Sequence, residues 1–393
     1  MDPRRNPFAP GAGSPPPELA GRDELRETVS IALDRIRTGR AAQSMILYGL
    51  RGVGKTVLLN AMRLRAEADG MATVAIEAPE DRSLPAILAP ALRAALLRMS
   101  RLRAAGHGIQ RAMQALAGFI KLKASYGDIE LALDLEPIAG LADSGDLETD
   151  LADLVEAVGQ TAQEHETAAV LFVDELQYVP EAQLAALITA LHRANQRRLP
   201  VALVGAGLPQ LLGQMGRAKS YAERLFRFEP IGALDRSAAF AALRDPIVEE
   251  EEAIDDAALQ AIFAETRGYP YFLQEWGKQS WDIAESSPIT EADVALASAA
   301  ALAQLDASFF RVRFDRLTPA EKTYIRAMAS LGEGPHRSGD IAERLGVKVT
   351  SVAPTRNALI RKGMIYSPSH GDTAFTVPMF DSFVRRIMPP EPQ

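Results

Sequence analysis

The sequence predicts an α/β fold in which a parallel sheet lies between two layers of helices, followed by a helical segment and a small C-terminal domain. Three observations lead to this prediction. Short apolar runs alternate with helical stretches, the runs are apolar on both faces, and helices dominate after residue 234. Strands that are buried on both faces and separated by helices are typical of a parallel sheet that is covered on both sides.

Residues 1–17 are rich in Pro, Gly and Ala and are predicted to be a disordered lead-in. A core at residues 18–234 follows, and alternation around Tyr126-Gly127 predicts a β-hairpin inserted into it at about 119–135. The other elements expected in this core are a helix at Glu18–Arg40, a strand at Ser44–Tyr48, a helix at Val57–Ala66, a strand at Ala72–Ile76, a helix from Ser83 to about Arg103, a helix at about Gly145–Glu164, a strand at Ala168–Val173, a helix at Pro180–Gln196 and a strand at Leu199–Gly205.

Residues 235–310 show helical patterns without strands and predict a helical lid. Residues 311–393 predict a winged-helix domain. Its first helix is marked by a capping box with proline at the first helical position, Thr318-Pro319-Ala320-Glu321. The other expected elements are a short helix capped by Ser338, a third helix from about Thr350 to Lys362, and two wing strands at Met364–Tyr366 and Ala374–Val377.

Composition excludes several classes of protein. The chain has 393 residues, 47% of them apolar, which predicts two or three soluble globular domains. It has no cysteine, which excludes disulfides and thiolate metal sites and fits a reducing cytoplasm. No apolar run approaches the ~20 residues of a membrane span. A net charge of −8 means that any nucleic-acid contact depends on a local patch.

A glycine-rich motif follows the first predicted strand and opens the next helix. Gly49-Leu50-Arg51-Gly52-Val53-Gly54-Lys55-Thr56 matches G-x-x-x-x-G-K-[ST], the P-loop of nucleotide-binding proteins. Its glycines let backbone N–H groups surround phosphates, and the helix that continues through Val57 directs its N-terminus at them. The spacing assigns Lys55 to the β- and γ-phosphates of ATP and Thr56 to Mg²⁺.

Two acids end a buried strand, at Asp174 and Glu175. Buried carboxylates are costly without a cation, so this pair predicts a magnesium site next to the P-loop. Asp174 is then the metal's outer ligand, and Glu175 is the base that polarises the attacking water. Gln177 either contacts the γ-phosphate or only begins the next helix.

Further basic residues have two interpretations each. Arg224 precedes a late strand and is either an arginine finger that reaches the ATP of a neighbouring subunit or a surface ion-pair partner. The C-terminal stretch has a modest positive excess. If Leu359 faces the core, Thr350, Asn357 and Arg361 lie on the outer side of the third helix, with Lys348 at its start, and can contact duplex DNA. The alternative is a wing that docks on protein.

These motifs together resemble the AAA+/STAND P-loop ATPases, and in particular the origin-recognition-like AAA ATPases of bacteria and the predicted archaeal ATPases. Leu19-Ala20-Gly21-Arg22-Asp23-Glu24 resembles the family's N-terminal motif, which implies that Gly21 and Arg22 lie against adenine. Asp174-Glu175-Leu176-Gln177 is similar to its acidic strand end, and Gly268-Tyr269-Pro270 to the lid motif near the nucleotide. Where many members carry a polar sensor, this chain reads Gly205-Ala206-Gly207, which favours slow hydrolysis.

The sequence thus predicts a cytoplasmic ATPase that uses ATP and Mg²⁺, hydrolyses slowly, and acts as a nucleotide-controlled switch on duplex DNA. A homo-oligomer with a trans arginine finger and no membrane association are expected with it. Two rivals stay open: a STAND-type signalling ATPase whose winged helix docks on protein, and an ATPase that loads a transposase or helicase of a mobile element.

Overall fold

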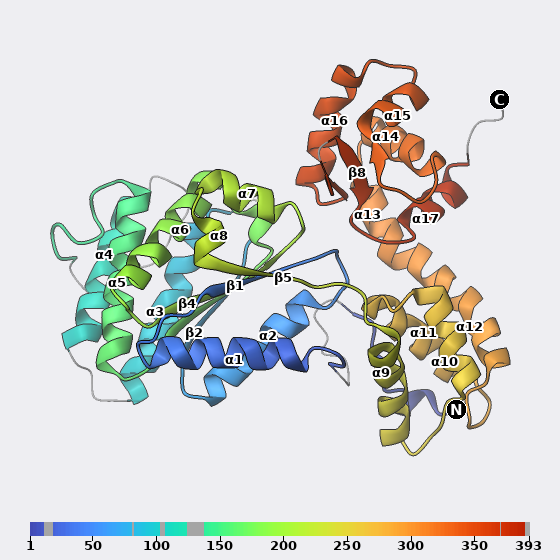
Figure 1. Cartoon of the computed structure of the whole chain (residues 1–393), viewed down its shortest axis with the longest axis horizontal. Helices are drawn as coiled ribbons and strands as arrows, with labels where there is room; N and C mark the ends of the chain where they lie inside the picture. Colours follow the sequence, from blue (N-terminus) through green and yellow to red (C-terminus); the bar gives the residue numbers. More distant parts are fainter. Residues whose placement is uncertain (12–18, 81, 103–106, 124–136, 370, 390–393) are drawn as a thin grey trace. The chain divides into compact units, whose positions relative to one another are not determined.

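The structure is a computed structural model that describes residues 1–11, 19–80, 82–102, 107–123, 137–369 and 371–389 (Figure 1). It divides into two compact units. The α/β unit consists of residues 22–48 and 55–230, and the helical unit of residues 1–21, 49–54 and 231–393. Most of the P-loop, residues 49–54, thus groups with the helical unit, whereas its lysine begins a helix of the α/β unit.

The α/β unit contains a five-stranded sheet with the order β2-β3-β4-β1-β5, in which every neighbouring pair is parallel. Its strands are β1 (Ser44–Tyr48), β2 (Ala72–Glu77), β3 (Ala169–Asp174), β4 (Val201–Gly207) and β5 (Phe226–Pro230). Gly205 in β4 pairs with Ile46 of β1 on one side and with Val173 of β3 on the other. The carboxyl end of β4 therefore lies between the strand that leads into the P-loop and the strand that ends in the two acids.

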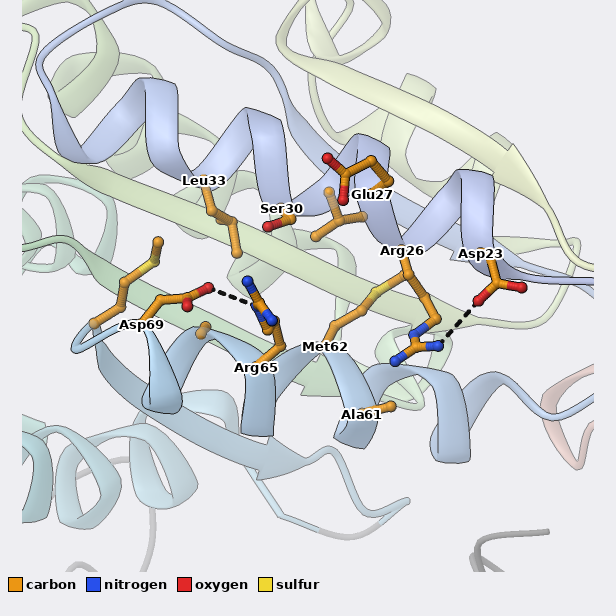
Figure 2. Close-up of a pocket in the computed structure, with 12 residues that line it drawn as sticks. Asp23, Arg26, Glu27, Ser30, Leu33, Ala61, Met62, Arg65 and Asp69 are labelled. Carbon is orange, nitrogen blue, oxygen red and sulfur yellow. Dashed lines mark hydrogen bonds and ion pairs between the residues drawn. The ribbon is translucent and has the colours of Figure 1, made fainter. Parts of the chain in front are cut away.

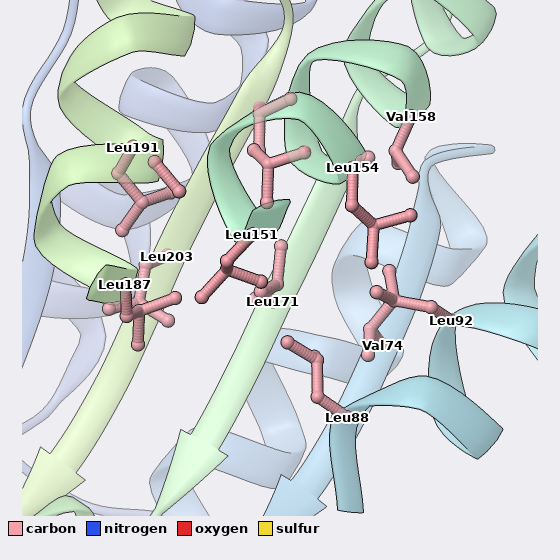
Figure 3. Packing of buried hydrophobic residues seen from close by; sticks show 14 of the residues in the cluster. Val74, Leu88, Leu92, Leu151, Leu154, Val158, Leu171, Leu187, Leu191 and Leu203 are labelled. Carbon is pink, nitrogen blue, oxygen red and sulfur yellow. The ribbon is translucent and has the colours of Figure 1, made fainter. Parts of the chain in front are cut away.

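Helices cover both faces of this sheet, as predicted (Figure 1). They are α1 (Asp23–Arg37), α2 (Lys55–Ala68), α3 (Leu84–Leu102), α4 (His107–Lys123), α5 (Leu147–Glu164), the 3-10 turn η3 (Leu176–Tyr178), α6 (Glu181–Gln196), α7 (Leu211–Ala218) and α8 (Ala222–Leu225). Leucines of α3, α5 and α6 pack on Val74, Leu171 and Leu203 of the three neighbouring strands (Figure 3). Each fully buried leucine contributes roughly 1.5–3 kcal/mol, so this layer holds the strand ends in place.

A groove of roughly 330 Å³ runs between α1 and α2 (Figure 2). Its charged side chains pair within their own helices, Arg26 Nη1 with Asp23 Oδ1 at 3.2 Å and Arg65 Nε with Asp69 Oδ2 at 2.9 Å. Such exposed pairs contribute little to stability. None of the predicted site residues lines the groove, so it is not the nucleotide site.

The helical unit combines a helical segment with a small C-terminal domain. Its elements are η1 (Pro3–Arg5), α9 (Arg236–Glu249), α10 (Asp256–Thr266), α11 (Pro270–Ile283), α12 (Glu291–Gln304), the π-helical turn η4 (Leu305–Phe310), α13 (Arg311–Asp315), α14 (Pro319–Ser330), β6 (His336–Arg337), α15 (Ser338–Arg344), α16 (Val349–Arg361), β7 (Ile365–Tyr366), β8 (Asp372–Phe375) and α17 (Phe380–Ile387). The predicted capping box at Thr318 and Glu321 is present. The strands form an antiparallel sheet in the order β6-β8-β7.

Three sequence predictions are wrong in detail. Residues Phe119–Lys123, expected to begin a β-hairpin, form the end of α4, because Leu116, Phe119 and Ile120 recur at helical spacing and are buried. The remainder of that predicted hairpin lies outside the described residues. The first helix begins at Asp23 and not at Glu18, after Gly21 adopts a positive φ of 69°. Ser338 is the first residue of α15, and not its cap.

The start of the chain is ordered rather than disordered as far as residue 11. Phe8 is 3% exposed and packs on Gly277 of α11, where a Cβ would lie only 2.9 Å from its ring. Asn6 donates to Asp282 Oδ1 at 2.8 Å, and the indole of Trp281 donates to the carbonyl of Asp2 at 2.9 Å. One aromatic and a few hydrogen bonds anchor this segment, which its proline-rich composition does not reveal.

The helices α12, η4 and α13 run together as Glu291–Asp315. By length and composition alone, this one helix among the described residues is apolar enough to cross a membrane, although a third of its most apolar window is buried. The prediction from the sequence that no apolar run approaches the length of a membrane span was therefore too strict. Core helices of soluble proteins pass the same test, so this feature carries no assignment.

Candidate functional site

The P-loop has a backbone that only glycine accommodates at several positions. Gly52 and Gly54 have φ angles of 83° and 89°, in the left-handed region that side chains disfavour. A Cβ on Gly49 would strike the carbonyl oxygen of Ile231. Leu50, Arg51 and Val53 complete the turn before α2 begins at Lys55. Such a turn exposes N–H groups to one side, which suits a phosphate chain.

Lys55, Thr56 and Val57 form the first turn of α2. The side chain of Lys55 is 8% exposed, and its positive charge lowers the pKa of Asp174. Thr56 Oγ1 donates a hydrogen bond of 2.6 Å to Asp174 Oδ2. The structure therefore brings together the lysine, the hydroxyl and the carboxylate that the motifs assign to phosphate and magnesium.

Asp174 is a buried acid at the end of β3. Burial raises its pKa, and the hydrogen bond from Thr56 partly opposes that rise. A second hydrogen bond, 2.8 Å from the backbone N–H of Glu175, occupies its other oxygen Oδ1. The carboxylate is thus positioned by two donors, yet burial outweighs these donors and Lys55, so its charged form is unfavourable without a metal ion.

Glu175 has a left-handed backbone, with φ 53° and ψ 36°, directly before η3. Such a conformation is rare for a residue with a side chain, and it is typical of functional sites. The amide of Gln177, Nε2, donates a short hydrogen bond to Glu175 Oε2. We refer to Thr56, Asp174, Glu175 and Gln177 as the acidic row.

Gln177 is 6% exposed, and its amide orientation is fixed by the end of β4. The backbone N–H of Leu208 donates to Gln177 Oε1 at 2.9 Å. Because a backbone N–H can only donate, the oxygen of the amide must face Leu208, and the NH₂ group then faces Glu175. Gln177 therefore does more than begin a helix.

The same contacts explain why β4 ends in glycines. A Cβ on Gly205 would strike Leu176 and would lie 2.9 Å from Ile46 Cδ1. A Cβ on Gly207 would lie 2.8 Å from Gln177 Oε1. The place where a polar sensor is expected has no room for a side chain, because Leu176 and Gln177 already fill it.

The other residues assigned to the nucleotide lie at turns. Gly21 is close to Ala238 of α9, where a Cβ would be 2.7 Å from the alanine methyl, and Arg22 precedes α1. Pro270 is the first residue of α11. Within the helical unit, the backbone N–H of Tyr271 donates to the carbonyl of Gly52 at 3.2 Å. The start of α11 therefore contacts the P-loop.

Two further residues near this contact were not assigned a role from the sequence. Tyr269 and Arg313 act electrostatically on each other, and both lie close enough to Arg51 to be affected by its charge. Arg313 belongs to α13, far along the chain from the P-loop, so spacing alone gives no signal for it. Tyr269 was noticed only as the middle residue of the lid motif.

The basic residues proposed for partners are exposed. Arg224 lies on α8. No carboxylate among the described residues pairs with its side chain, whereas nearby Arg227 pairs with Glu229. In the C-terminal domain the side chains assigned to DNA are all exposed, namely Lys348, Thr350, Asn357 and Arg361. Leu359 is buried, as the helical spacing requires.

Two other basic side chains of that domain form hydrogen bonds and an ion pair within the fold instead. Arg356 bonds Thr373 Oγ1 at 2.9 Å and Ser367 Oγ at 2.9 Å, and Lys362 pairs with Glu321 at 2.7 Å. The usable positive surface is thus smaller than the count of basic residues indicates. Within the described part of the chain, no three His, Asp or Glu side chains form a metal cluster. This suits Mg²⁺, which is commonly held by one or two protein oxygens together with substrate phosphates.

Comparison with known proteins finds family matches for two parts of the chain. Residues 18–204 match the family described as AAA ATPase domain, and residues 307–384 match a family described as Domain of unknown function (DUF8462). A search of the curated proteins finds no match.

Among solved structures, the Walker-type ATPase PABY2304 of Pyrococcus abyssi is 15% identical with a TM-score of 0.57, over 93% of this chain and 96% of that one. The Orc1 protein of Aeropyrum pernix in complex with DNA is 16% identical, with a TM-score of 0.45 and 94% of each chain covered. The RuvB Holliday junction branch migration motor of Thermotoga maritima is 15% identical, with a TM-score of 0.45, over 93% of this chain and 95% of that one. The likeness to the first of these shows the fold.

Proposed function

Because residues 18–204 carry an AAA ATPase domain and the chain is an ATPase, we propose that it works as a slow, nucleotide-controlled switch that uses ATP and Mg²⁺. The acidic row is the observation that carries this proposal. Its donors hold the two carboxylates at the carboxyl edge of the parallel sheet, where ligands of α/β proteins bind.

The residues present fit magnesium ATP. The P-loop turns tightly on its glycines, and a Cβ on Gly49 would strike the carbonyl oxygen of Ile231. Lys55 supplies a cation for the β- and γ-phosphates, and the oxygens of Thr56 and Asp174 lie 2.6 Å apart. Bound Mg²⁺ supplies charge neutralisation for the phosphates. It also offsets the desolvation that raises the pKa of Asp174.

In this proposal Glu175 accepts a proton from the attacking water, and Gln177 acts as a positioning residue. Gln177 links the Glu175 carboxylate to the backbone of Leu208, so the angle of the base depends on the end of β4. It takes the place of a polar sensor at Gly205–Gly207, but its amide is occupied on both sides. We infer that Gln177 orients Glu175 but supplies no free amide to the γ-phosphate, which makes turnover slow.

A Gln177 series tests this proposal. Gln177→Met keeps the size of the side chain but loses both hydrogen bonds, and it should lower kcat by about tenfold or more while ATP affinity stays within about twofold. Gln177→Glu places a carboxylate against Glu175 and should shift the pH profile of kcat to higher pH, because a like charge raises the pKa of the base. A matched control is Gln183→Met on α6. Unchanged kcat and pH profile in both Gln177 variants would contradict the positioning role.

We further propose that the C-terminal domain is a winged helix that binds duplex DNA through α16. The exposed residues Lys348, Asn357 and Arg361 on or beside this helix support it, since arginine and asparagine side chains read base edges and lysine contacts phosphate. Binding should be weak and salt-sensitive. Arg361→Ala should weaken it at low salt and lower the salt slope by about one, whereas Arg65→Ala on α2 should not.

One observation favours a second function for this domain, docking on protein. Val347 and Val349, on either side of Lys348, are 46% and 50% exposed. Exposed apolar side chains at the start of a helix suit a protein partner as well as thymine methyl groups. If DNA binding is unchanged both in Arg361→Ala and at high salt, this alternative is favoured.

Assembly is proposed from Arg224, which the described residues leave without an ion-pair partner. As an arginine finger it acts on the ATP of a neighbouring subunit, so specific activity should rise with protein concentration. Arg224→Ala should abolish that rise, and Arg217→Ala, which removes only a surface pair with Glu181, should not. Flat specific activity over a hundredfold concentration range would indicate a monomeric switch.

A further inference from the structure

The helix that carries Arg224 is too short to fix its own direction. α8 is four residues long, and its Ala222 and Leu225 are buried whereas Arg224 is exposed. Isolated helices of this length are unstable in water, because so few backbone hydrogen bonds do not offset the loss of conformational freedom. The direction of Arg224 therefore depends on the contacts that α8 and its flanking residues make with other elements of the α/β unit.

A chain of hydrogen bonds connects the start of α8 to α5 and α6. The hydroxyl of Thr189 on α6 donates to Glu148 Oε1 of α5 at 2.9 Å, and Lys219 Nζ donates to the same oxygen at 2.5 Å. The bond from Lys219 lowers the pKa of Glu148, so this acid is a carboxylate at neutral pH and can only accept. The hydroxyls of Thr189 and Tyr221 lie 3.3 Å apart. Because Thr189 uses its single hydrogen on Glu148, Tyr221 must be the donor to Thr189.

These contacts hold the residue that begins α8. Tyr221 lies directly before the helix, and its carbonyl accepts from the backbone N–H of Arg224 at 3.0 Å. The ring of Tyr221 also packs on the ring of His192 of α6, with centroids 4.6 Å apart. Side chains of two longer helices thus fix the backbone from which Arg224 extends. We refer to Glu148, Thr189, Lys219 and Tyr221 as the α8 anchor.

The end of α8 has a second attachment. Gln43, which precedes β1, donates from Nε2 to the carbonyl of Arg224 at 2.9 Å. The backbone of Arg224 is therefore bonded at its N–H and at its carbonyl, whereas its exposed side chain has no ion-pair partner among the described residues. A guanidinium on a fixed backbone, left unpaired by its own fold, suits an anion of another molecule.

We propose that Tyr221 and Gln43 are positioning residues, which set the direction in which Arg224 meets the ATP of a neighbouring subunit. The inference rests on the proposed function, since it assumes that Arg224 is an arginine finger. A finger acts only where its guanidinium reaches the transferred phosphate, and a displacement of about 1 Å costs about 10²-fold in rate. Loss of either attachment gives α8 more than one orientation, so the finger is in place less often.

Single variants test the two attachments. Tyr221→Phe removes the hydroxyl but keeps the ring on His192, and Gln43→Ala removes the bond at the end of α8. Each should lower the specific activity reached at high protein concentration by about tenfold or more. Thr189→Val removes the acceptor of the tyrosine hydroxyl and should act as Tyr221→Phe does. Steady-state ATPase rates over a hundredfold range of protein concentration measure these effects.

The same changes in an Arg224→Ala background separate positioning from a structural role. If Tyr221 and Gln43 act through Arg224, neither has anything left to position there, so adding Tyr221→Phe or Gln43→Ala to Arg224→Ala should slow hydrolysis no further. Thr149→Val is the matched control, because it removes another bond from a threonine to an acid, to Asp146 at 2.7 Å on the start of α5. It should keep the wild-type rise of activity with concentration.

Thermal unfolding is measured alongside, and each single variant should unfold within ~4 °C of the wild type, the shift expected for one lost hydrogen bond. A wild-type rise of activity in Tyr221→Phe or Gln43→Ala, or a further loss on top of Arg224→Ala, would overturn the inference. Failure of the proposed assembly looks different. In that case Arg224→Ala itself rises as the wild type does, or the wild type shows no rise, and the positioning role falls with it.

Discussion

The acidic row of the α/β unit and the pair Tyr269 and Arg313 of the helical unit differ in how their polar groups are satisfied. In the acidic row each carboxylate already accepts hydrogen bonds, from Thr56 and a backbone N–H at Asp174 and from Gln177 at Glu175. Among the described residues, no carboxylate pairs with the guanidinium of Arg313, and the buried hydroxyl of Tyr269 has no hydrogen-bond partner. The comparison teaches that hydrogen bonds within the fold already position one region, whereas the other keeps polar groups that the described residues do not satisfy.

The largest effect is expected at Lys55, the buried lysine beside Asp174. Lys55→Ala removes a buried cation that, in the proposed site, donates several charge-assisted hydrogen bonds to phosphate, so ATP affinity should fall on the order of 10³-fold. Titration calorimetry measures it, with the exposed Arg65→Ala on the same helix as control. An affinity equal to that of the wild type would show that the loop holds no phosphate, and would remove the basis of the comparison.

The next effect isolates the chemical step in the acidic row. Glu175→Gln cannot accept a proton but keeps the size of the side chain, so hydrolysis should slow by ~10²-fold or more while ATP stays bound. Single-turnover phosphate release measures the rate, and calorimetry measures the affinity. Wild-type turnover in this variant would assign the base elsewhere and leave Glu175 with a structural role only.

A third prediction concerns the crowded end of β4. Gly205→Asn introduces the polar side chain that a sensor position lacks, but its Cβ would strike Leu176. Overpacking of this kind costs ~1–3 kcal/mol, so the variant should unfold at a lower temperature and should not hydrolyse ATP faster. Calorimetric unfolding and steady-state rates check both parts. Faster hydrolysis at unchanged stability would show that the row adapts to a new neighbour, contrary to the idea of a prearranged region.

The smallest effect is a pH dependence. Burial raises the pKa of Asp174 in the fold, so its charged form costs stability, and this cost appears as pH rises through that pKa. Asp174→Asn keeps similar hydrogen-bonding atoms without charge. Without nucleotide it should be more stable than the wild type at neutral pH by ~1 kcal/mol, and the gap should close as pH falls. Denaturant titrations over pH measure this gap. A gap that does not change with pH would mean that Asp174 is satisfied even without a cation.

The comparison also shows which parts of the site the sequence reveals. The P-loop and the two acids are readable because each is a local pattern, a strand followed directly by the residues that matter. The partners of Gln177 are not, since they require knowledge that β4 lies beside β3. Arg313 belongs to no sequence pattern, because its position near Arg51 depends on how α13 packs in the helical unit.

The errors in the predicted fold have the same origin. Residues 119–123 fit alternation and helical spacing alike, and only burial of Phe119 against the core decides for the helix. The proline-rich start of the chain is ordered by Phe8 and Asn6, two residues that composition averages away. The parallel sheet and its helices were predictable because their apolar runs are long and repeat in order.

The bonds of Arg51 have a consequence for how signals pass through this molecule. Its backbone N–H donates to the carbonyl of Thr376 at 3.2 Å, and its Nε donates to the carbonyl of Gly363 at 3.3 Å. Two hydrogen bonds therefore join the P-loop to residues next to the small C-terminal sheet. Thermodynamic linkage is reciprocal. If nucleotide binding strengthens or breaks these hydrogen bonds and so changes the affinity of the C-terminal domain for a macromolecule, that macromolecule must change nucleotide affinity by the same factor. In that case a partner would sense the nucleotide without touching it, and nucleotide affinity would report the partner.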